Sequence, residues 1–230
     1  MNTKPFSYIW KTATILIMLY VIIGGMLFEV PALPVIHQTI RNVYFHVGMW
    51  FSMIFVMFLG AVFSLIYLNK LDLRYDRMAN AAVKTGLVFG VLGIVTGMIW
   101  AQFTWGRFWV NDPKLNGAAV GILVYLAYVV LRSSLEDREK RARLAAVYKI
   151  FAFVIMFTFI MILPRLTGAS IHPGVDGNPA LATGDLDPAM RKVFYPAIAA
   201  WFLFSYWVYS VVYRSDSIKE RIHQLMADKH

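Results

Sequence analysis

A chain of 230 residues has the length of one ordinary domain, and its composition places that domain in a membrane. Hydrophobic residues make up 59% of the chain and charged residues only 15%, whereas soluble domains carry about 25% charge. This composition excludes a disordered chain, a fibrous repeat and a coiled coil. The absence of cysteine excludes disulfides, thiolate metal sites, thiol catalysis and covalent c-type haem attachment.

Six mostly apolar segments are long enough to cross a bilayer core, which needs about 20 residues per helix. Because lipid leaves backbone groups without water, and because these runs lack the alternation of barrel strands, we expect helices. The expected fold is all-α, a polytopic membrane protein that forms one integral-membrane domain over residues 1–230. The predicted spans are Ile9–Phe28, Val47–Leu68, Thr85–Gln102, Pro113–Leu131, Ala145–Leu163 and Val193–Tyr213.

The distribution of Lys and Arg predicts the orientation of these spans. Sixteen of the 22 basic residues fall in the termini and in the connections on their side, so both termini are expected in the cytoplasm. The net charge of +9 therefore reflects topology and requires no nucleic acid. The first segment offers no clean signal-peptide cleavage site and is expected to remain as a helix. The other basic residues lie in three outward connections: Arg41, Arg107, Lys114, Arg165, Arg191 and Lys192.

Several short patterns predict helix ends. Asp112-Pro113 and Asp187-Pro188 each combine an N-cap carboxylate with proline at the first helical position. Pro164 is expected to end the fifth span because its ring interrupts the hydrogen-bond ladder. The mixed charges of residues 135–143 indicate a solvated helix extension at the headgroups, or alternatively a docking site for a cytoplasmic partner.

Glycines spaced four residues apart predict close helix packing, since they let two backbones approach in lipid. We expect the third and fourth spans to pack tightly on each other through these positions. The glycines are Gly86, Gly90, Gly93 and Gly97 on the third span, and Gly117 and Gly121 on the fourth.

The second outward connection, residues 100–112, concentrates aromatic side chains: three Trp and two Phe accompany one Arg. One interpretation is an aromatic belt at the headgroup level. The alternative is a flat apolar shelf for a large planar ligand. Gly106 lets the chain turn sharply within this connection.

Three histidines lie on the expected outer side, at positions 37, 46 and 172. Neutral imidazole is a common metal ligand, and a haem iron accepts one on each face. In one helix over residues 36–50, His37 and His46 would point roughly 180° apart, so His46 and His172 form the better pair. A hydrogen bond to a backbone carbonyl is the alternative role for each. The outer cations suit haem propionates, or serve only as topological anchors.

Residues 105–112, Trp-Gly-Arg-Phe-Trp-Val-Asn-Asp, resemble the tryptophan-rich "WWD" signature of haem-handling membrane proteins. With Arg41 and Tyr44-Phe45-His46 upstream, and with six spans, the chain resembles the haem exporter protein C (CcmC-type) family of cytochrome c maturation. The larger CcsA branch has more spans and histidines within them. This chain has Phe108 and Asn111 where the family often has Trp, and Lys114 where it often has Arg.

The resemblance implies that the chain binds haem b at the periplasmic face of the bacterial inner membrane. It implies presentation to a periplasmic haem chaperone (CcmE-type), without catalytic turnover. The implied partners are ABC-transporter subunits (CcmA/CcmB-type), a small membrane protein (CcmD-type) and membrane lipid. The implied axial iron ligands are His46 and His172. The other implied cofactor-binding residues are Arg41, Trp105, Gly106, Arg107, Phe108, Trp109 and Asp112.

Two other functions use similar residues. A b-type membrane cytochrome that exchanges electrons with quinone would also need two histidines, but it commonly holds them deep within facing helices. A haem permease would often show broken helices or ionisable residues at mid-depth. No acidic pair, P-loop or activated serine indicates a hydrolase or a phosphoryl-transfer enzyme.

Overall fold

The computed structural model describes residues 4–32, 36–167, 170–172 and 186–227 of the chain. These residues form helices joined by short connections, with no strand among them. The prediction of an all-α fold is therefore confirmed. The elements are α1 (Lys4–Leu27), the 3-10 helix η1 (His37–Asn42), α2 (Val43–Lys70), α3 (Leu73–Trp105), α4 (Pro113–Ser133), α5 (Arg138–Phe157), the π-helix η2 (Thr158–Ile162), α6 (Leu163–Thr167) and α7 (Pro188–Ala227).

Six helical segments in the described residues are long and apolar enough to cross a membrane, and each overlaps one predicted span. Two helices are longer than their apolar cores. α3 begins at Leu73 rather than near Thr85, because the Asp72 carboxylate caps it by accepting from the Arg74 amide at 2.8 Å. α7 continues to Ala227, beyond the apolar run. Backbone hydrogen bonds can continue a helix beyond its apolar run. A hydropathy pattern marks only the apolar run, so it predicts a shorter helix.

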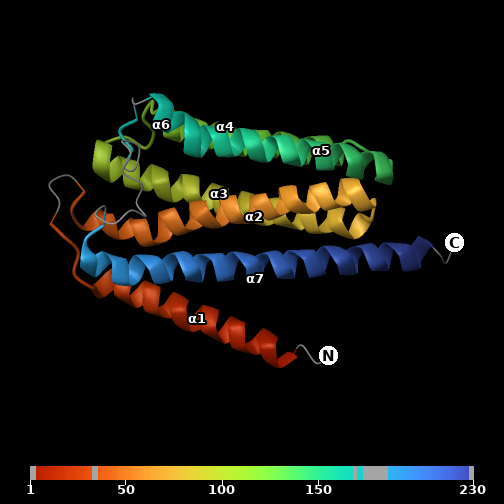
Figure 1. The fold of residues 1–230 in the computed structure, drawn as a ribbon. Helices are drawn as coiled ribbons and strands as arrows, with labels where there is room; N and C mark the ends of the chain where they lie inside the picture. Colours follow the sequence, from red (N-terminus) through yellow and green to blue (C-terminus); the bar gives the residue numbers. More distant parts are fainter. Residues whose placement is uncertain (1–3, 33–35, 168–169, 173–185, 228–230) are drawn as a thin grey trace.

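The helices run side by side as an elongated bundle (Figure 1). α7 contacts α1 on one side and the α2–α3 pair on the other, while α5 packs on both α2 and α4. The described ends of the chain lie at one end of this bundle, together with the α2–α3 and α4–α5 connections (Figure 1). We call this the predicted inner end. The opposite end carries residues 28–32, 36–42, 106–112 and 170–172, and we call it the predicted outer end.

The helix-start predictions are confirmed at both Asp-Pro pairs. The Asp112 side chain accepts from the amides of Lys114 and Leu115, and Pro113 occupies the first turn of α4. At the start of α7, the Asp187 carboxylate accepts from the Ala189 amide at 2.8 Å. The charged run 135–143 enters a helix at Arg138. Residues 168–169 and 173–185 of the third predicted outer connection lie outside the described part of the chain.

The predicted packing partner of the glycines is wrong for most positions. The glycines of α3 face α2: a methyl group there would meet Met57 at Gly86, Trp50 at Gly93 and His46 at Gly97. Only Gly90 also meets α4, through Ile122. Gly117 and Gly121 of α4 lie instead against the α5–η2 segment. A Gly-x-x-x-Gly pair predicts that some helix comes close, but it does not identify which one.

The prediction that Pro164 ends the fifth span is also wrong. α5 passes through the π-helical turn η2 into α6, which continues past Pro164 to Thr167. A π-turn changes the backbone hydrogen-bond spacing immediately before the proline, and such local adjustments let proline persist in membrane helices. The Phe159 carbonyl within η2 lies directly against Gly117, where any side chain would overlap it.

A buried ionic cluster joins three helices near the predicted inner end. Asp76 of α3 accepts two hydrogen bonds from the Arg132 guanidinium of α4, at 2.9 and 2.7 Å. The fully buried Lys149 of α5 lies 3.3 Å from the same carboxylate. Buried charges in a membrane protein are expensive unless paired in this way. Glu220 of α7 forms further ion pairs, with Arg77 of α3 and with Arg138 of α5.

Gly117→Ala should destabilise the protein, because its methyl group would overlap the Phe159 carbonyl, a backbone atom that cannot rotate away. Overpacking of this kind costs about 1–3 kcal/mol. We therefore expect a lower apparent melting temperature for the variant in detergent.

Gly60→Ala is the matched control, since its methyl group would meet neighbours at an ordinary 3.5 Å. It should leave the melting temperature unchanged or raise it. Equal melting temperatures for the two variants would contradict the close α4–η2 contact.

Candidate functional site

His46 lies in the first turn of α2 and is 6% exposed. Its Nδ1 is 3.1 Å from the Thr96 hydroxyl of α3. That hydroxyl already donates its proton to a backbone carbonyl, with Leu92 O at 2.9 Å. We therefore assign the Nδ1–H tautomer, in which the hydroxyl accepts from His46 and the Nε2 lone pair is left as the metal-binding position.

Gly97 and two indoles fix the position of the His46 ring. A methyl group at Gly97 would lie 2.7 Å from the His46 Cε1 atom, so only glycine admits the ring here. The rings of Trp50 and Trp100 pack edge-on against His46, with centroids at 6.3 and 5.8 Å. The Trp100 indole is itself held by a 3.2 Å hydrogen bond to the Thr39 hydroxyl of η1.

The connection between α3 and α4 turns at Gly106, as predicted. Its φ of +73° closes α3 in the left-handed conformation, and its amide donates to the Gln102 carbonyl. After the turn, the Trp109 indole donates to the Asn116 side chain at 3.2 Å. The Asn116 amide in turn donates to Asn111 at 2.7 Å. Asn111 thus helps to orient Trp109.

His172 lies in the short described segment 170–172 of the third outer connection. Its ring packs against Trp105 with a centroid distance of 6.5 Å. Its amide donates to the Ser170 hydroxyl at 3.2 Å. The segment is bound to Asp112, the N-cap of α4, through the Ser170 hydroxyl and the Ile171 amide.

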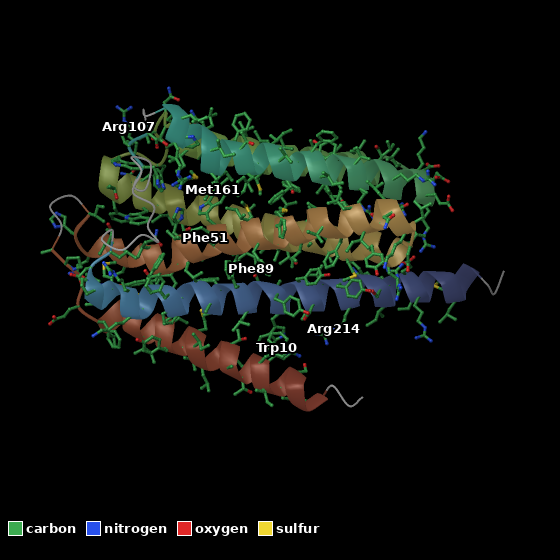
Figure 2. The ribbon with its side chains drawn as sticks, viewed as in Figure 1. Trp10, Phe51, Phe89, Arg107, Met161 and Arg214 are labelled. Carbon is green, nitrogen blue, oxygen red and sulfur yellow. The ribbon has the colours of Figure 1, made fainter. Side chains whose placement is uncertain are left out.

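His46 and His172 line one cavity of about 450 Å³ at the predicted outer end. Its walls come from α2 and α3 on one side and from α4, η2 and α6 on the other. Phe51 of α2 and Met161 of η2, both labelled in Figure 2, belong to these walls. The aromatic, basic and imidazole side chains of the lining are His46, Trp50, Phe51, Trp100, Trp105, Trp109, Lys114, Arg165 and His172.

The predicted site residues divide into two groups. His46, His172, Trp105 and Trp109 line the cavity. Gly106, Arg107, Phe108, Asp112 and Arg41 lie outside its lining.

Arg41 and Arg107, which lie outside the lining, have different surroundings. Arg41 binds the C-terminal end of α1, since its guanidinium donates to the carbonyls of Gly25 and Phe28 at 3.0 and 2.6 Å. Arg107 is exposed at the end of the bundle (Figure 2).

Sequence reasoning missed Trp50 and Thr96 as site residues. Trp50 follows His46 by one helical turn, and Thr96 precedes Trp100 by one turn. Spacing of four residues places side chains on one helix face. Applied outward from His46 and Trp100, this rule would have found both residues.

The lining chemistry limits what the cavity can bind. A volume of about 450 Å³ falls within the range of about 300–1,000 Å³ that is usual for small-molecule sites. Within the described residues, no group of three or more His, Asp or Glu side chains could hold a metal ion. Two imidazoles, an apolar aromatic wall and two cations therefore fit a large flat metal complex that brings its own in-plane ligands and carries acidic groups.

Comparison with known proteins identifies a matching family and several relatives. A sequence model of the family described as "Cytochrome C assembly protein" matches residues 2–172. "Heme exporter protein C" of Paracoccus denitrificans is 26% identical over 82% of this chain and 78% of its own length. The proteins of the same name from Rhodobacter capsulatus and Escherichia coli K12 are 30% and 28% identical, over 59% and 72% of this chain. The chain spans 55% and 65% of these last two relatives.

Gly97→Val should displace the His46 ring and lengthen its hydrogen bond to Thr96, because the added side chain occupies the space of Cε1. Selective ¹⁵N-histidine NMR of the ligand-free protein should show a shifted His46 Nδ1 resonance.

Gly86→Val is the matched control on the same helix, since it meets the flexible Met57 side chain. It should leave the His46 resonance in place. An unmoved signal in Gly97→Val would contradict the contact between Gly97 and His46.

Proposed function

The chain belongs to the cytochrome c assembly protein family, and on that premise we propose that this multi-pass membrane protein binds haem b at its predicted outer end and presents it to a periplasmic haem chaperone. The observation that carries the proposal is the shared cavity, which His46 and His172 line together with four tryptophans. The relatives named heme exporter protein C support haem as the cargo. We propose no catalytic turnover for the chain itself.

The two histidines are proposed as the axial iron ligands. His46 presents Nε2, because Nδ1 is engaged with Thr96. Hydrogen bonding of the other ring nitrogen is a common way to orient a metal-binding histidine. His172 comes from a separate connection and packs against Trp105. Ligands on two chain segments allow one bond to be released by a loop movement while the other is kept.

Lys114 and Arg165 are proposed to bind the haem propionates, since both line the cavity. They replace Arg41 and Arg107 in that role, because the former binds α1 and the latter is exposed away from the lining. Charge-assisted bonds to carboxylates are among the strongest in proteins. Trp100, Trp105 and Trp109 supply the apolar surface for the porphyrin ring.

We further propose the bacterial inner membrane as the location, residues 1–230 as one haem-handling domain, and the cytoplasm for both termini. The partners proposed are a CcmE-type chaperone, CcmA/CcmB-type ABC-transporter subunits and a CcmD-type small membrane protein. The positive charge concentrated at the predicted inner end supports the orientation. The relatives' name, exporter protein C, supports a role within a larger export machinery.

His46→Ala and His172→Ala should each alter the Soret absorbance of detergent-purified protein and block loading of the chaperone. Loss of one axial ligand changes the coordination of the iron, whereas loss of both should abolish binding. His37→Ala is the control, because His37 lies on the same side but not in the cavity lining. Its spectrum should match the wild type.

Wild-type protein without Soret absorbance, even when produced with its chaperone, would contradict the proposal. Haem reduction by quinone in the isolated protein would support the cytochrome alternative instead. Haem accumulation in reconstituted vesicles would support a permease.

Lys114→Gln and Arg165→Gln should each weaken haem binding by about tenfold or more, the size expected for one lost charge-assisted hydrogen bond. Lys114→Arg should retain affinity because the charge is kept. Absorbance titration of haem into the ligand-free protein measures the effect. Arg107→Gln serves as the control, and an equal loss in this variant would indicate a general charge effect.

A further inference from the structure

Asp112 has more hydrogen bonds than a helix cap needs. Its Oδ1 accepts from the Lys114 amide at 2.8 Å, from the Leu115 amide at 3.3 Å and from the Ser170 hydroxyl at 3.0 Å. Its Oδ2 accepts from the Ile171 amide at 2.8 Å. The side chain is 2% exposed, although it belongs to a connection at the end of the bundle. One carboxylate thus joins the start of α4 to the segment that carries His172.

Apolar burial does not explain how residues 170–172 are held. The Ile171 side chain is 59% exposed, so it contributes little packing. Polar attachments of the segment include the two bonds to Asp112 and the bond from the His172 amide to the Ser170 hydroxyl. Ser170 itself is buried, and its hydroxyl links His172 to the Asp112 carboxylate. This polar connection therefore positions His172 together with the ring contact to Trp105.

The place of Asp112 at a helix start suits a carboxylate side chain. It lies at the N-terminus of α4, where the helix dipole and free amides favour an anion. Bonds from neutral donors to a carboxylate are stronger than bonds between neutral groups. Asp112 does not line the cavity, and its charge would repel the propionates of a bound haem.

We infer that Asp112 is the positioning residue for His172: its carboxylate caps α4 through Oδ1 and holds residues 170–172 through both oxygens, so that His172 faces the cavity. This inference rests on the proposed function for its consequence in haem ligation. The clasp itself, formed by Asp112, Ser170 and Ile171, exists without haem. It assigns the final Asp of the tryptophan-rich connection a role in geometry rather than in contact with the cofactor.

Asp112→Asn separates the two functions of the carboxylate. The amide oxygen can still cap α4, as Asn is a good N-cap. The amide nitrogen, a donor, then faces the Ile171 amide, also a donor, so this bond is lost. Hydrogen exchange of the haem-free protein should show the Ile171 amide exchanging about tenfold faster or more, with the first turns of α4 unchanged.

The haem-loaded Asp112→Asn protein should have a spectrum shifted toward that of His172→Ala, because His172 is no longer held in place. Ser170→Ala removes one arm of the clasp and leaves the cap intact, so it should show the same changes to a smaller extent. Asp137→Asn is the matched control: Asp137 caps α5 by accepting from the Lys140 amide, and it should change neither exchange at Ile171 nor the spectrum.

Unchanged exchange at Ile171 in both Asp112→Asn and Ser170→Ala would overturn the inference. If Asp112→Asn disrupts α4, Ser170→Ala decides alone: faster exchange supports the clasp, and wild-type exchange overturns it. Faster exchange in variants of a protein that never binds haem would uphold the clasp and overturn the proposed function. Faster exchange with an unaltered haem spectrum would overturn the role of Asp112 in positioning His172.

Discussion

The contact between α2 and α3 depends on the missing side chains of four glycines. Gly86, Gly90, Gly93 and Gly97 form a strip along α3, and large side chains of α2 occupy the space that methyl groups would take. Toward the predicted outer end those side chains are Trp50 and His46. The same strip that joins the two helices therefore also fixes the ring that faces the cavity. The packing of α2 on α3 and the placement of the His46 ring therefore depend on the same contact. In lipid, dispersion forces at close approach hold two helices together where the hydrophobic effect does not act.

The two ends of the bundle are held together differently. Near the predicted inner end, Asp76, Arg132 and Lys149 connect α3, α4 and α5 through buried charges. Near the predicted outer end, α4 is separated from α2 and α3 by the cavity. Between these levels α4 lies against α5 and η2 at Gly117 and Gly121. The bundle is thus tied by ionic contacts at one end and leaves room for a ligand at the other.

Much of this architecture follows from one-dimensional patterns. Apolar length predicts the six spans, and the Asp-Pro pairs predict two helix starts, because both are local properties of the chain. The positive φ at Gly106 is local as well. The helix that packs against each glycine strip is not a local property, because many helices could supply the facing side chains. The π-turn before Pro164 lies against Gly117, a residue far away in sequence, and no local rule anticipates this contact.

For the candidate site, the sequence predicted the place of the site better than the role of each residue. A concentration of tryptophans and outer histidines indicates where a ligand binds, and both histidines line the cavity. The individual cations could not be assigned, because an arginine near a helix end reaches either a ligand or backbone carbonyls. Arg41 does the latter. Asp112 is similar: its sequence context predicts a cap, and only the folded chain brings Ser170 and Ile171 to the same carboxylate.

The π-turn η2 has a consequence for every side chain that follows it. Such a turn holds one residue more than an α-helical turn, so the side chains after it are rotated by roughly 100° about the helix axis relative to a continuous α-helix with the same number of residues. Arg165, which comes after the turn, lines the cavity in that shifted register. In a continuous α-helix with the same number of residues, the same arginine would face a different side. The backbone geometry at η2, and not composition alone, therefore decides which charge this wall of the cavity presents.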